Sequence, residues 1–340
     1  MNDIESTGLN NPMFPNNSVS CIGGREENQD TCGLVETRRG ILALVCDGMG
    51  GMNGGATASR MAVEEIIRYI DMPAQEDSLE EDSQMLLKKA ICYANQKIFE
   101  LASETPSLAG MGTTVTALLI NENKATVAYV GDSRVYQIRH GRKIFRTFDH
   151  SMVFEMVKKK ILTEEQARLS AQSNIILRAL GQKEEVTVDT FDLAYDKGDI
   201  FFLCTDGVWG TMPERELIKR ISTGQHPKAV TETLAMSIHG DKLREGGGHD
   251  NLTATMIQTT TNSKVRNKME DKLRKALIVC AVLLLISIIC NFIPRPGQKT
   301  SSEDAQKTST IEKVDNPTEQ EEQSASQTTN EGEDNSSEKK

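Results

Sequence analysis

The chain has 340 residues, of which 38% are hydrophobic and only 4% are aromatic. This length allows one large domain or two average ones, with a core built mainly from aliphatic side chains and Met. The formal net charge of -10 argues against a nucleic-acid partner, because affinity for the phosphate backbone comes from clustered Lys and Arg. Seven cysteines without a C-x-x-C pair or a regular spacing predict reduced thiols rather than a disulfide framework.

Composition divides the chain into five segments. Residues 1–17 are polar and rich in Asn, and we expect them to form a flexible leader without a secretory signal. Residues 18–260 alternate strand-like and helix-like stretches with short connections, which predicts a compact domain. Residues 261–275 form a basic linker, 276–293 an uncharged apolar stretch, and 294–340 an acidic tail rich in Ser, Thr and Gln. We expect the tail to be disordered, because it has little apolar surface to bury, and its role as stalk, sensor or spacer is open.

Short apolar runs rich in β-branched residues predict strands within the central segment, and apolar stripes at helical spacing predict helices. The predicted strands are 41–46, 114–120, 125–130, 135–138, 200–204 and 252–257. The predicted helices are 56–70, 83–102 and 213–221, together with a pair in 149–174 joined near Leu162. Thr163 and Gln166 stand at capping-box spacing at the start of the second helix of that pair. Because helices and strands are mixed without a strict βαβ alternation, we expect an α+β fold.

The stretch 276–293 contains 18 residues without a charge, enough for a helix to cross a bilayer core of about 30 Å. A buried core helix is the alternative, but the stretch has no polar face and precedes the polar tail. Six basic residues lie in 264–275, whereas only Arg295 and Lys299 follow closely. The sequence therefore predicts a C-terminal transmembrane helix in the cell membrane, with the large domain 18–260 in the cytoplasm and the tail on the opposite side.

Four aspartates each follow a short apolar run at a glycine or small polar turn: Asp47, Asp132, Asp206 and Asp250. A single Asp-Gly pair is also a favoured hairpin turn, but four such sites indicate strand ends that direct carboxylates toward shared metal ions. Oxygen ligands of this kind suit Mg²⁺ or Mn²⁺. Zinc is disfavoured, because the five histidines are scattered, and we interpret His249 as a loop residue rather than a ligand.

The glycine cluster GMGGMNGG at 48–55 fits neither a P-loop nor a dinucleotide motif, since it lacks their fixed spacing. It permits close approach of backbone to a metal site, and the carbonyl of Gly48 is a candidate ligand. Upstream, Arg25 precedes Asp30 in GGREENQD. A guanidinium binds phosphate through a planar fork, so Arg25 is a candidate to hold a phosphoryl group, although an exposed arginine beside two glutamates is usually only a solvated charge.

The motifs together resemble those of the metal-dependent protein phosphatase 2C family in its bacterial form. In chain order they are GGREENQD, LVCDGMGG, GMGTTVTALLI, YVGDSRVY, DHSMV, ILRALG, FFLCTDGVW and GHDNLTA, and they cover about residues 20–257. The resemblance implies a four-layer αββα fold, in which a central β-sandwich of two antiparallel sheets is flanked by helices. It also implies that the metal ions lie in a cleft at one end of the sandwich.

The resemblance implies a site with two Mn²⁺ or Mg²⁺ ions and a third, weaker one. Asp47 would bridge the first two ions, and the carbonyl of Gly48 would bind one of them. Asp206 and Asp250 would complete the ligand set on the other ion. Asp132 would hold the third.

The same resemblance implies hydrolysis of phosphoserine and phosphothreonine by a water that two metal ions activate, without a covalent intermediate. Asp30 would orient that water and Arg25 would hold the substrate phosphate. Met49 stands where eukaryotic members often have a histidine proposed as general acid, so the identity of the acid is open. The implied partners are phosphoproteins, which we expect to be substrates of a serine/threonine kinase at the same membrane.

Several alternatives stay open at this point. A catalytically silent scaffold on the same fold and a small-molecule phosphomonoesterase share the motifs, although no core carboxylate has been lost. The segment 149–174 matches the mobile flap of bacterial relatives, and the lysines at 158–160 would either meet acidic substrates or form a solvated helix face. His150 in DHSMV is interpreted as a residue that fixes this segment rather than as an acid.

Overall fold

The computed structural model describes residues 4–50, 54–72, 82–246 and 248–292, with side chains as far as Ile288. By contacts along the chain it divides into two units, Met1–Val282 and Leu283–Lys340. The first unit contains all the described strands, which form two antiparallel six-stranded sheets. No disulfide joins the six cysteines whose side chains the structure describes, in agreement with the sequence.

The first sheet has the order β1-β2-β12-β11-β8-β9. Its strands are β1 (Ile4–Thr7), β2 (Asn16–Cys21), β12 (Leu252–Gln258), β11 (Ile200–Cys204), β8 (Arg134–Arg139) and β9 (Arg142–Arg146). The second sheet has the order β10-β7-β6-β4-β3, with β5 paired to β4. Its strands are β10 (Asp189–Leu193), β7 (Ala125–Val130), β6 (Val115–Ile120), β4 (Gly40–Met49), β3 (Asp30–Thr37) and β5 (Gly112–Thr113).

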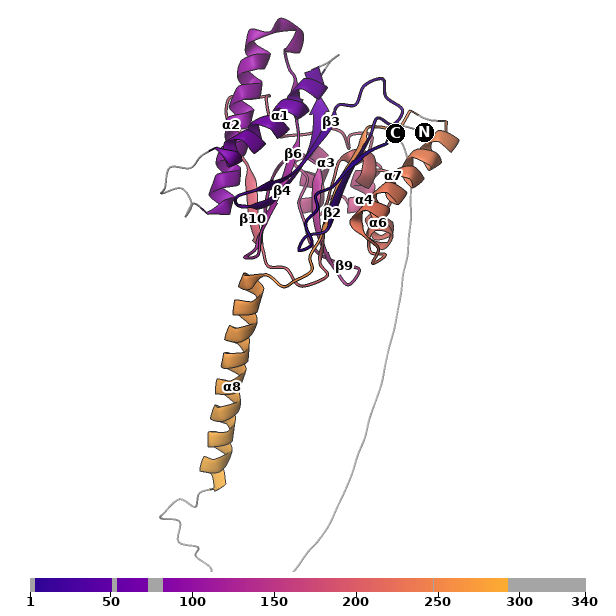
Figure 1. Cartoon of the computed structure of the whole chain (residues 1–340). Helices are drawn as coiled ribbons and strands as arrows, with labels where there is room; N and C mark the ends of the chain where they lie inside the picture. Colours follow the sequence, from indigo (N-terminus) through magenta and orange to yellow (C-terminus); the bar gives the residue numbers. More distant parts are fainter. Residues whose placement is uncertain (1–3, 51–53, 73–81, 247, 293–340) are drawn as a thin grey trace, which may run out of the picture. The chain divides into compact units, whose positions relative to one another are not determined.

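Helices cover both outer faces of the sandwich, as Figure 1 shows. The second sheet packs against α1 (Gly54–Asp71) and α2 (Ser83–Glu104), after which comes the short 3-10 turn η2 (Pro106–Leu108). The first sheet packs against α5 (Asp206–Trp209), α6 (Glu214–Ile221) and α7 (Pro227–Arg244). Two short helices, α3 (Met152–Lys158) and α4 (Glu164–Arg168), follow β9 and occupy the predicted flap.

Strand β4 shows how the sequence builds these layers. Its side chains alternate between two cores, because successive residues of a strand point to opposite faces of a sheet. Ile41, Ala43 and Val45 belong to the core between the sheets, which also contains Phe201 of β11. The intervening residues of β4 belong to the core beneath α1 and α2. The fold is therefore α+β with two antiparallel sheets and flanking helices, as predicted.

The predicted strands and helices are all present, with ends that differ by a few residues. The capping box is confirmed, since Thr163 accepts from Gln166 N and the Gln166 side chain accepts from Thr163 N. The sequence did not predict the strands β1, β2, β3, β5, β9 and β10 or the helices α5 and α7. α7 was missed because Met236 and Leu243 are apolar but exposed, which weakens the contrast between a polar and an apolar helix face.

The N-terminal segment differs from the flexible leader expected for residues 1–17. Residues Ile4–Thr7 form β1, which pairs with β2 in an antiparallel register. Side chains reinforce this pairing: Asn17 Nδ2 donates to Ser6 Oγ at 3.1 Å, and Asn16 Oδ1 accepts from Leu9 N at 2.7 Å. The Asn residues that suggested a loose segment are in fact the ones that tie it to the sheet.

The predicted linker 261–275 is helical from Lys264 onward, where α8 (Lys264–Phe292) begins. Its first turn is bonded to a loop of the sandwich. Lys264 N donates to Glu122 O at 2.8 Å, and Val265 N donates to Asn123 O at 3.1 Å. The Lys264 ammonium also lies 2.7 Å from the Glu122 carboxylate. The start of the helix is therefore fixed to this loop.

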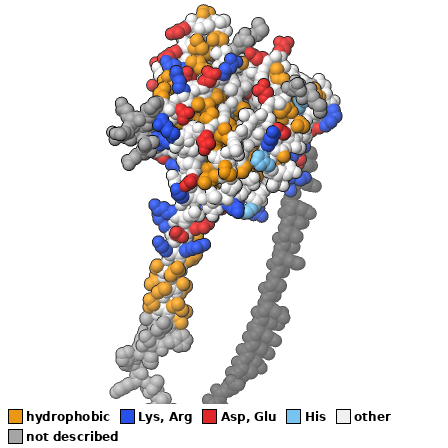
Figure 2. Space-filling view, viewed as in Figure 1, with side chains coloured by type: hydrophobic (Ala, Val, Ile, Leu, Met, Phe, Trp, Pro, Cys, Tyr) orange, Lys and Arg blue, Asp and Glu red, His pale blue; other side chains and the backbone are white. Residues whose placement is uncertain are grey.

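Along α8, basic residues are followed by apolar ones, as Figure 2 shows. Large apolar side chains between Leu277 and Ile288 are exposed. Within the described residues, we find no helix whose length and apolar character would let it span a membrane. The last five side chains of the predicted apolar segment 276–293, and the whole predicted tail 294–340, lie outside the described residues.

Candidate active site

The predicted site residues come from the ends of several strands. Asp30 is the first residue of β3 and lies directly across from Asp47 of β4. Asp132 lies in the turn between β7 and β8, and Asp206 is the first residue of α5, just after β11. Asp250 stands two residues before β12. The charges of Asp30, Asp132, Asp206 and Asp250 all act on Asp47, so the structure brings the five carboxylates into one group.

Burial and mutual repulsion make this group unusual. Burial, together with the charges of Asp206 and Asp250, raises the pKa of Asp30 to about 7 despite hydrogen bonds from Thr253 and Thr205. Burial and the charge of Asp250 raise the pKa of Asp206 to about 6. Burial and the charge of Asp206 also raise the pKa values of Asp47 and Asp132. The protein thus gathers more negative charge here than its own cations compensate.

Threonine residues hold the two central carboxylates in place. Thr205 Oγ1 donates to Asp30 Oδ2 at 2.9 Å. The backbone of Asp47 is held from both sides, since its N–H donates to Thr114 Oγ1 at 2.9 Å and its carbonyl accepts from Thr114 N at 2.8 Å. The sequence analysis did not single out these threonines. Their signal was present in the run GTTV of one motif and in CTDG of another.

Gly48 is required by close backbone packing. A Cβ on Gly48 would lie 2.1 Å from the carbonyl oxygen of Gly55, so no larger residue fits there. Its N–H donates to Gln29 O at 3.0 Å, which joins the end of β4 to the segment before β3. This packing fits the expected close approach of backbone at the site, and the role of the Gly48 carbonyl as a metal ligand stays a prediction.

Asn251 joins the segment around Asp250 to the loop that carries Arg25. Its Nδ2 donates to Ile22 O at 2.7 Å and to Glu27 O at 3.0 Å, while its Oδ1 accepts from Gln29 N. The sequence analysis quoted this residue within GHDNLTA without giving it a role. Its three bonds make it the residue that fixes the loop against the site.

Arg25 is exposed, and it lies next to a predicted metal ligand. Its guanidinium donates to Asp250 Oδ2 at 2.8 Å. The structure therefore places Arg25 at the rim of the carboxylate group, where its charge also acts on Asp206. The predicted contact of Arg25 with a substrate phosphate stays a prediction.

The residues present fit divalent cations. Among the described residues, no group donates a hydrogen bond to the buried Asp132 Oδ1, and a hydrogen bond links the carboxyl groups of Asp47 and Asp206, which would both be charged in solution. Across the described residues, no three acidic, His or Cys side chains converge tightly enough to enclose an ion by themselves. Mg²⁺ keeps several waters and uses few carboxylates, and Mn²⁺ shares its preference for oxygen ligands, so a spread set suits them.

A stacked arginine connects Asp132 to the flap. Arg134 is buried and donates to both carboxylate oxygens of Asp149, at 2.9 and 2.7 Å. Its guanidinium lies 3.6 Å from the ring centre of Trp209, and Trp209 Nε1 donates to Asp132 O at 3.1 Å. The sequence analysis missed this role of Trp209, although it is the only tryptophan of the chain.

The histidines have structural contacts. His150 is buried, its Nδ1 accepts from Gly131 N at 3.1 Å, and its Nε2 lies 3.3 Å from Asp189 Oδ2, so it fixes the flap segment as predicted. His249 Nε2 lies 3.1 Å from His239 Nδ1 in the loop before β12. Lys158 pairs with Glu155 on its own helix, which is typical of a solvated helix face.

Carboxylates that converge at one end of a β-sandwich and are short of positive charge are typical of hydrolases that work with divalent metal ions. Comparison with known proteins identifies the family. Residues 19–277 match the model of the family described as protein phosphatase 2C.

Two curated proteins are similar over most of their length. The chain is 32% identical over 247 residues to a serine/threonine phosphatase stp of Listeria innocua serovar 6a, covering 72% of this chain and 94% of that protein. It is 35% identical over 236 residues to the protein phosphatase PhpP of Streptococcus pneumoniae, covering 68% and 92%.

A solved structure gives the same result for the fold. The catalytic domain of the serine threonine protein phosphatase PstP, in complex with 2 manganese ions, superposes with a TM-score of 0.59 at 27% identity, covering 73% of this chain and 98% of that domain. The chain belongs to the protein phosphatase 2C family, and it is a protein phosphatase.

Proposed function

We propose that the chain removes phosphate from phosphoserine and phosphothreonine in proteins, using two or three Mn²⁺ or Mg²⁺ ions held by the carboxylate group. The observation that carries this proposal is the group itself, in which burial and mutual repulsion raise the pKa values of Asp30, Asp47, Asp132 and Asp206. Family membership and relatives named serine/threonine phosphatases support the same activity.

Asp47, Asp206 and Asp250, with the carbonyl of Gly48, would hold two ions, and Asp132 would hold the third. When bound, such ions lower the pKa of water and offset the charge that develops on phosphoryl oxygens. Asp30, which accepts a hydrogen bond from Thr205, would orient a water for attack on phosphorus. Arg25 at the rim would hold the phosphate oxygens through its planar fork.

The activity is tested with the full chain and a phosphothreonine peptide, in Mn²⁺ or in chelator, with Asp206→Asn as the variant. We expect hydrolysis that depends on Mn²⁺ and is lost in Asp206→Asn. p-Nitrophenyl phosphate serves as a second substrate. Turnover of p-nitrophenyl phosphate without turnover of any phosphopeptide would indicate a small-molecule phosphomonoesterase instead, and no turnover by folded, metal-loaded protein would indicate a scaffold.

We further propose that the chain is held at the cell membrane by residues 276–293, with the phosphatase domain in the cytoplasm and the tail on the other side. The support is the uncharged sequence of this stretch, the six basic residues in 264–275, and the exposure of apolar side chains such as Leu283 and Leu284 on α8. Its substrates would then be phosphoproteins of a serine/threonine kinase at the same membrane.

The membrane proposal is tested by washing membranes with alkaline carbonate, comparing the unaltered chain with Leu284→Arg. A charge at the centre of a spanning helix costs about 2.5–3.5 kcal/mol, so the variant should be partly released while the unaltered chain stays in the pellet. Release of both would contradict the tether. If protease outside intact cells digested the phosphatase domain rather than the tail, the orientation would be wrong.

A further inference from the structure

A polar groove leads away from the carboxylate group along the end of α7. One cavity of about 340 Å³ is lined by Asp206 and Asp250 and also by Thr211, Lys242 and Glu245. A second cavity of about 320 Å³ shares these last three residues. The two cavities therefore adjoin at these three residues, and together they extend from the carboxylates along the surface as a groove.

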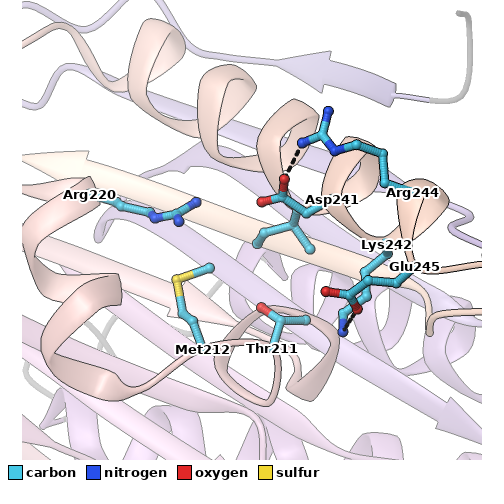
Figure 3. A pocket seen from close by; sticks show the side chains of 8 residues that line it. Thr211, Met212, Arg220, Asp241, Lys242, Arg244 and Glu245 are labelled. Carbon is cyan, nitrogen blue, oxygen red and sulfur yellow. Dashed lines mark hydrogen bonds and ion pairs between the residues drawn. The ribbon is translucent and has the colours of Figure 1, made fainter.

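Figure 3 shows the distal part of this groove. The last turn of α7 forms one side, with Asp241, Lys242, Arg244 and Glu245, and the turn after α5 forms the other, with Thr211 and Met212. Arg220 reaches in from α6, where its Nη1 donates to Ser237 Oγ at 2.9 Å. Met212 and Ile238 are buried beneath these polar groups. The groove therefore has an apolar base and charged walls.

Within the described residues, Lys242 and Arg244 are each paired with a carboxylate three residues away along the chain. Lys242 Nζ lies 2.7 Å from Glu245 Oε2, three residues further along α7, and Arg244 pairs with Asp241 in the same way. Side-chain exposures of 31% for Lys242 and 63% for Glu245 leave this pair accessible to solvent. Exposed pairs of this kind are weak, so an incoming carboxylate can replace Glu245 at little cost.

We propose that this groove receives the polypeptide of the substrate on one side of the phosphorylated residue, and that Lys242 recognises an acidic side chain there. The inference rests on the proposed phosphatase function, since it requires the phosphorylated residue to sit at Asp206 and Asp250. Lys242 stands at the junction of the two cavities, where a flanking residue must pass. Without substrate, Glu245 pairs with the ammonium group of Lys242. The substrate carboxylate then takes the place of Glu245.

The test compares phosphothreonine peptides that differ only in flanking residues, acidic or neutral, placed before or after the phosphorylated residue. With the full chain in Mn²⁺, we expect kcat/KM to favour one acidic peptide by about threefold, the value of one exposed charge pair. Lys242→Met should remove this preference. Glu245→Gln should increase it, because Lys242 is then free of its competing partner.

Lys228→Met is the matched control, because Lys228 lies on the same helix and pairs with Glu232 one turn away, outside the groove. It should leave the preference unchanged. The proposal is overturned if the unaltered chain shows no preference, if Lys242→Met keeps it, or if Glu245→Gln and Lys242→Met change it in the same direction.

Failure of the phosphatase function itself would be distinguishable. If neither peptides nor p-nitrophenyl phosphate are hydrolysed in Mn²⁺, binding of the fluorescein-labelled peptides, followed by fluorescence anisotropy, decides the matter. Tighter binding of one acidic peptide that Lys242→Met removes would support the groove proposal even then, and equal binding of acidic and neutral peptides would overturn it.

Discussion

Two buried groups of charged residues lie close together in this molecule. They differ in whether the chain itself neutralises their charge. At the carboxylate group, Asp30, Asp47 and Asp206 face one another, and their pKa values are raised. In the neighbouring arginine cluster, Arg134 donates two hydrogen bonds to Asp149, and its guanidinium stacks on Trp209. Both groups are taken out of water, but only the second provides its own counter-charge.

A second arginine extends the balanced group into the flap. Arg146 is buried, and it pairs with Glu164 of α4 at 2.7 Å and with Glu214 of α6 at 2.9 Å. Buried charges that are paired in this way hold a structure together, and their loss is costly. Buried charges of one sign persist only if something outside the chain neutralises them, which is why we propose that cations act at the carboxylate group.

The largest effect should come from Asp206→Asn, which removes one carboxylate of the unbalanced group. We expect kcat/KM for a phosphothreonine peptide to fall about 10³-fold, since metal activation contributes several kcal/mol. The metal-free variant should melt at a higher temperature than the metal-free parent, because one repulsive charge is gone. Asp71→Asn, at an exposed site at the end of α1, should change neither quantity. Near-normal activity of Asp206→Asn would contradict the assignment.

In the arginine cluster, where the charges are paired, removing one charge should lower the stability of the protein. Arg134→Met leaves Asp149 buried and without its partner, so we expect a loss of about 3 kcal/mol in the free energy of unfolding. Urea denaturation should show the same loss with Mn²⁺ and with chelator. Adding Asp149→Leu should recover much of it, because the uncompensated charge is then removed. A loss below about 1 kcal/mol in the single variant would show that the pair is not important for stability.

The carboxylate group should also make the stability of the metal-free protein depend on pH. Asp30 and Asp206 have folded-state pKa values of about 7 and about 6, above the ordinary value of 3.8 that holds in the unfolded chain. Between pH 4 and 7 the folded state therefore binds more protons, and the stability of the metal-free protein should fall as pH rises through this range. Saturating Mn²⁺ should abolish the fall. Melting temperatures of the metal-free protein at pH 5, 6 and 7 would measure this fall in stability. A melting temperature that rises with pH in chelator would contradict the prediction.

The smallest effect should come from the flap. Thr163→Ala removes the capping box of α4 and should cost about 1 kcal/mol locally. Hydrogen exchange should then be faster at the amides of 164–169 and unchanged in β4. Ser173→Ala, in the exposed turn after α4, is the control. Faster exchange throughout the domain would show that the cap supports more than its own helix.

Much of the fold could be predicted because its signals are local. The continuous apolar run of β4 and the capping box of α4 depend only on neighbours along the chain. β1 could not be predicted, because Ile4–Thr7 become a strand only through pairing with β2 and through the side chain of Asn17. The same applies to β10, whose partner β7 lies some sixty residues away in the chain.

The site was predictable in its carboxylates but not in their surroundings. Asp47, Asp132 and Asp206 stand at strand ends that the sequence marks with glycine or small residues. The contact of Arg25 with Asp250 joins residues more than two hundred positions apart, and no local pattern encodes it. The stack of Arg134 on Trp209 is likewise a tertiary contact.

The most direct test of the central claim is a calorimetric titration of Mn²⁺ into the metal-free full chain, with Asp47→Asn and Asp132→Asn as variants. The account predicts two or three ions per chain, loss of the tight binding in Asp47→Asn, and loss of only the weakest ion in Asp132→Asn. Fewer than two ions in the unaltered chain, or the same titration curve for Asp47→Asn, would show that the carboxylate group is not a metal centre.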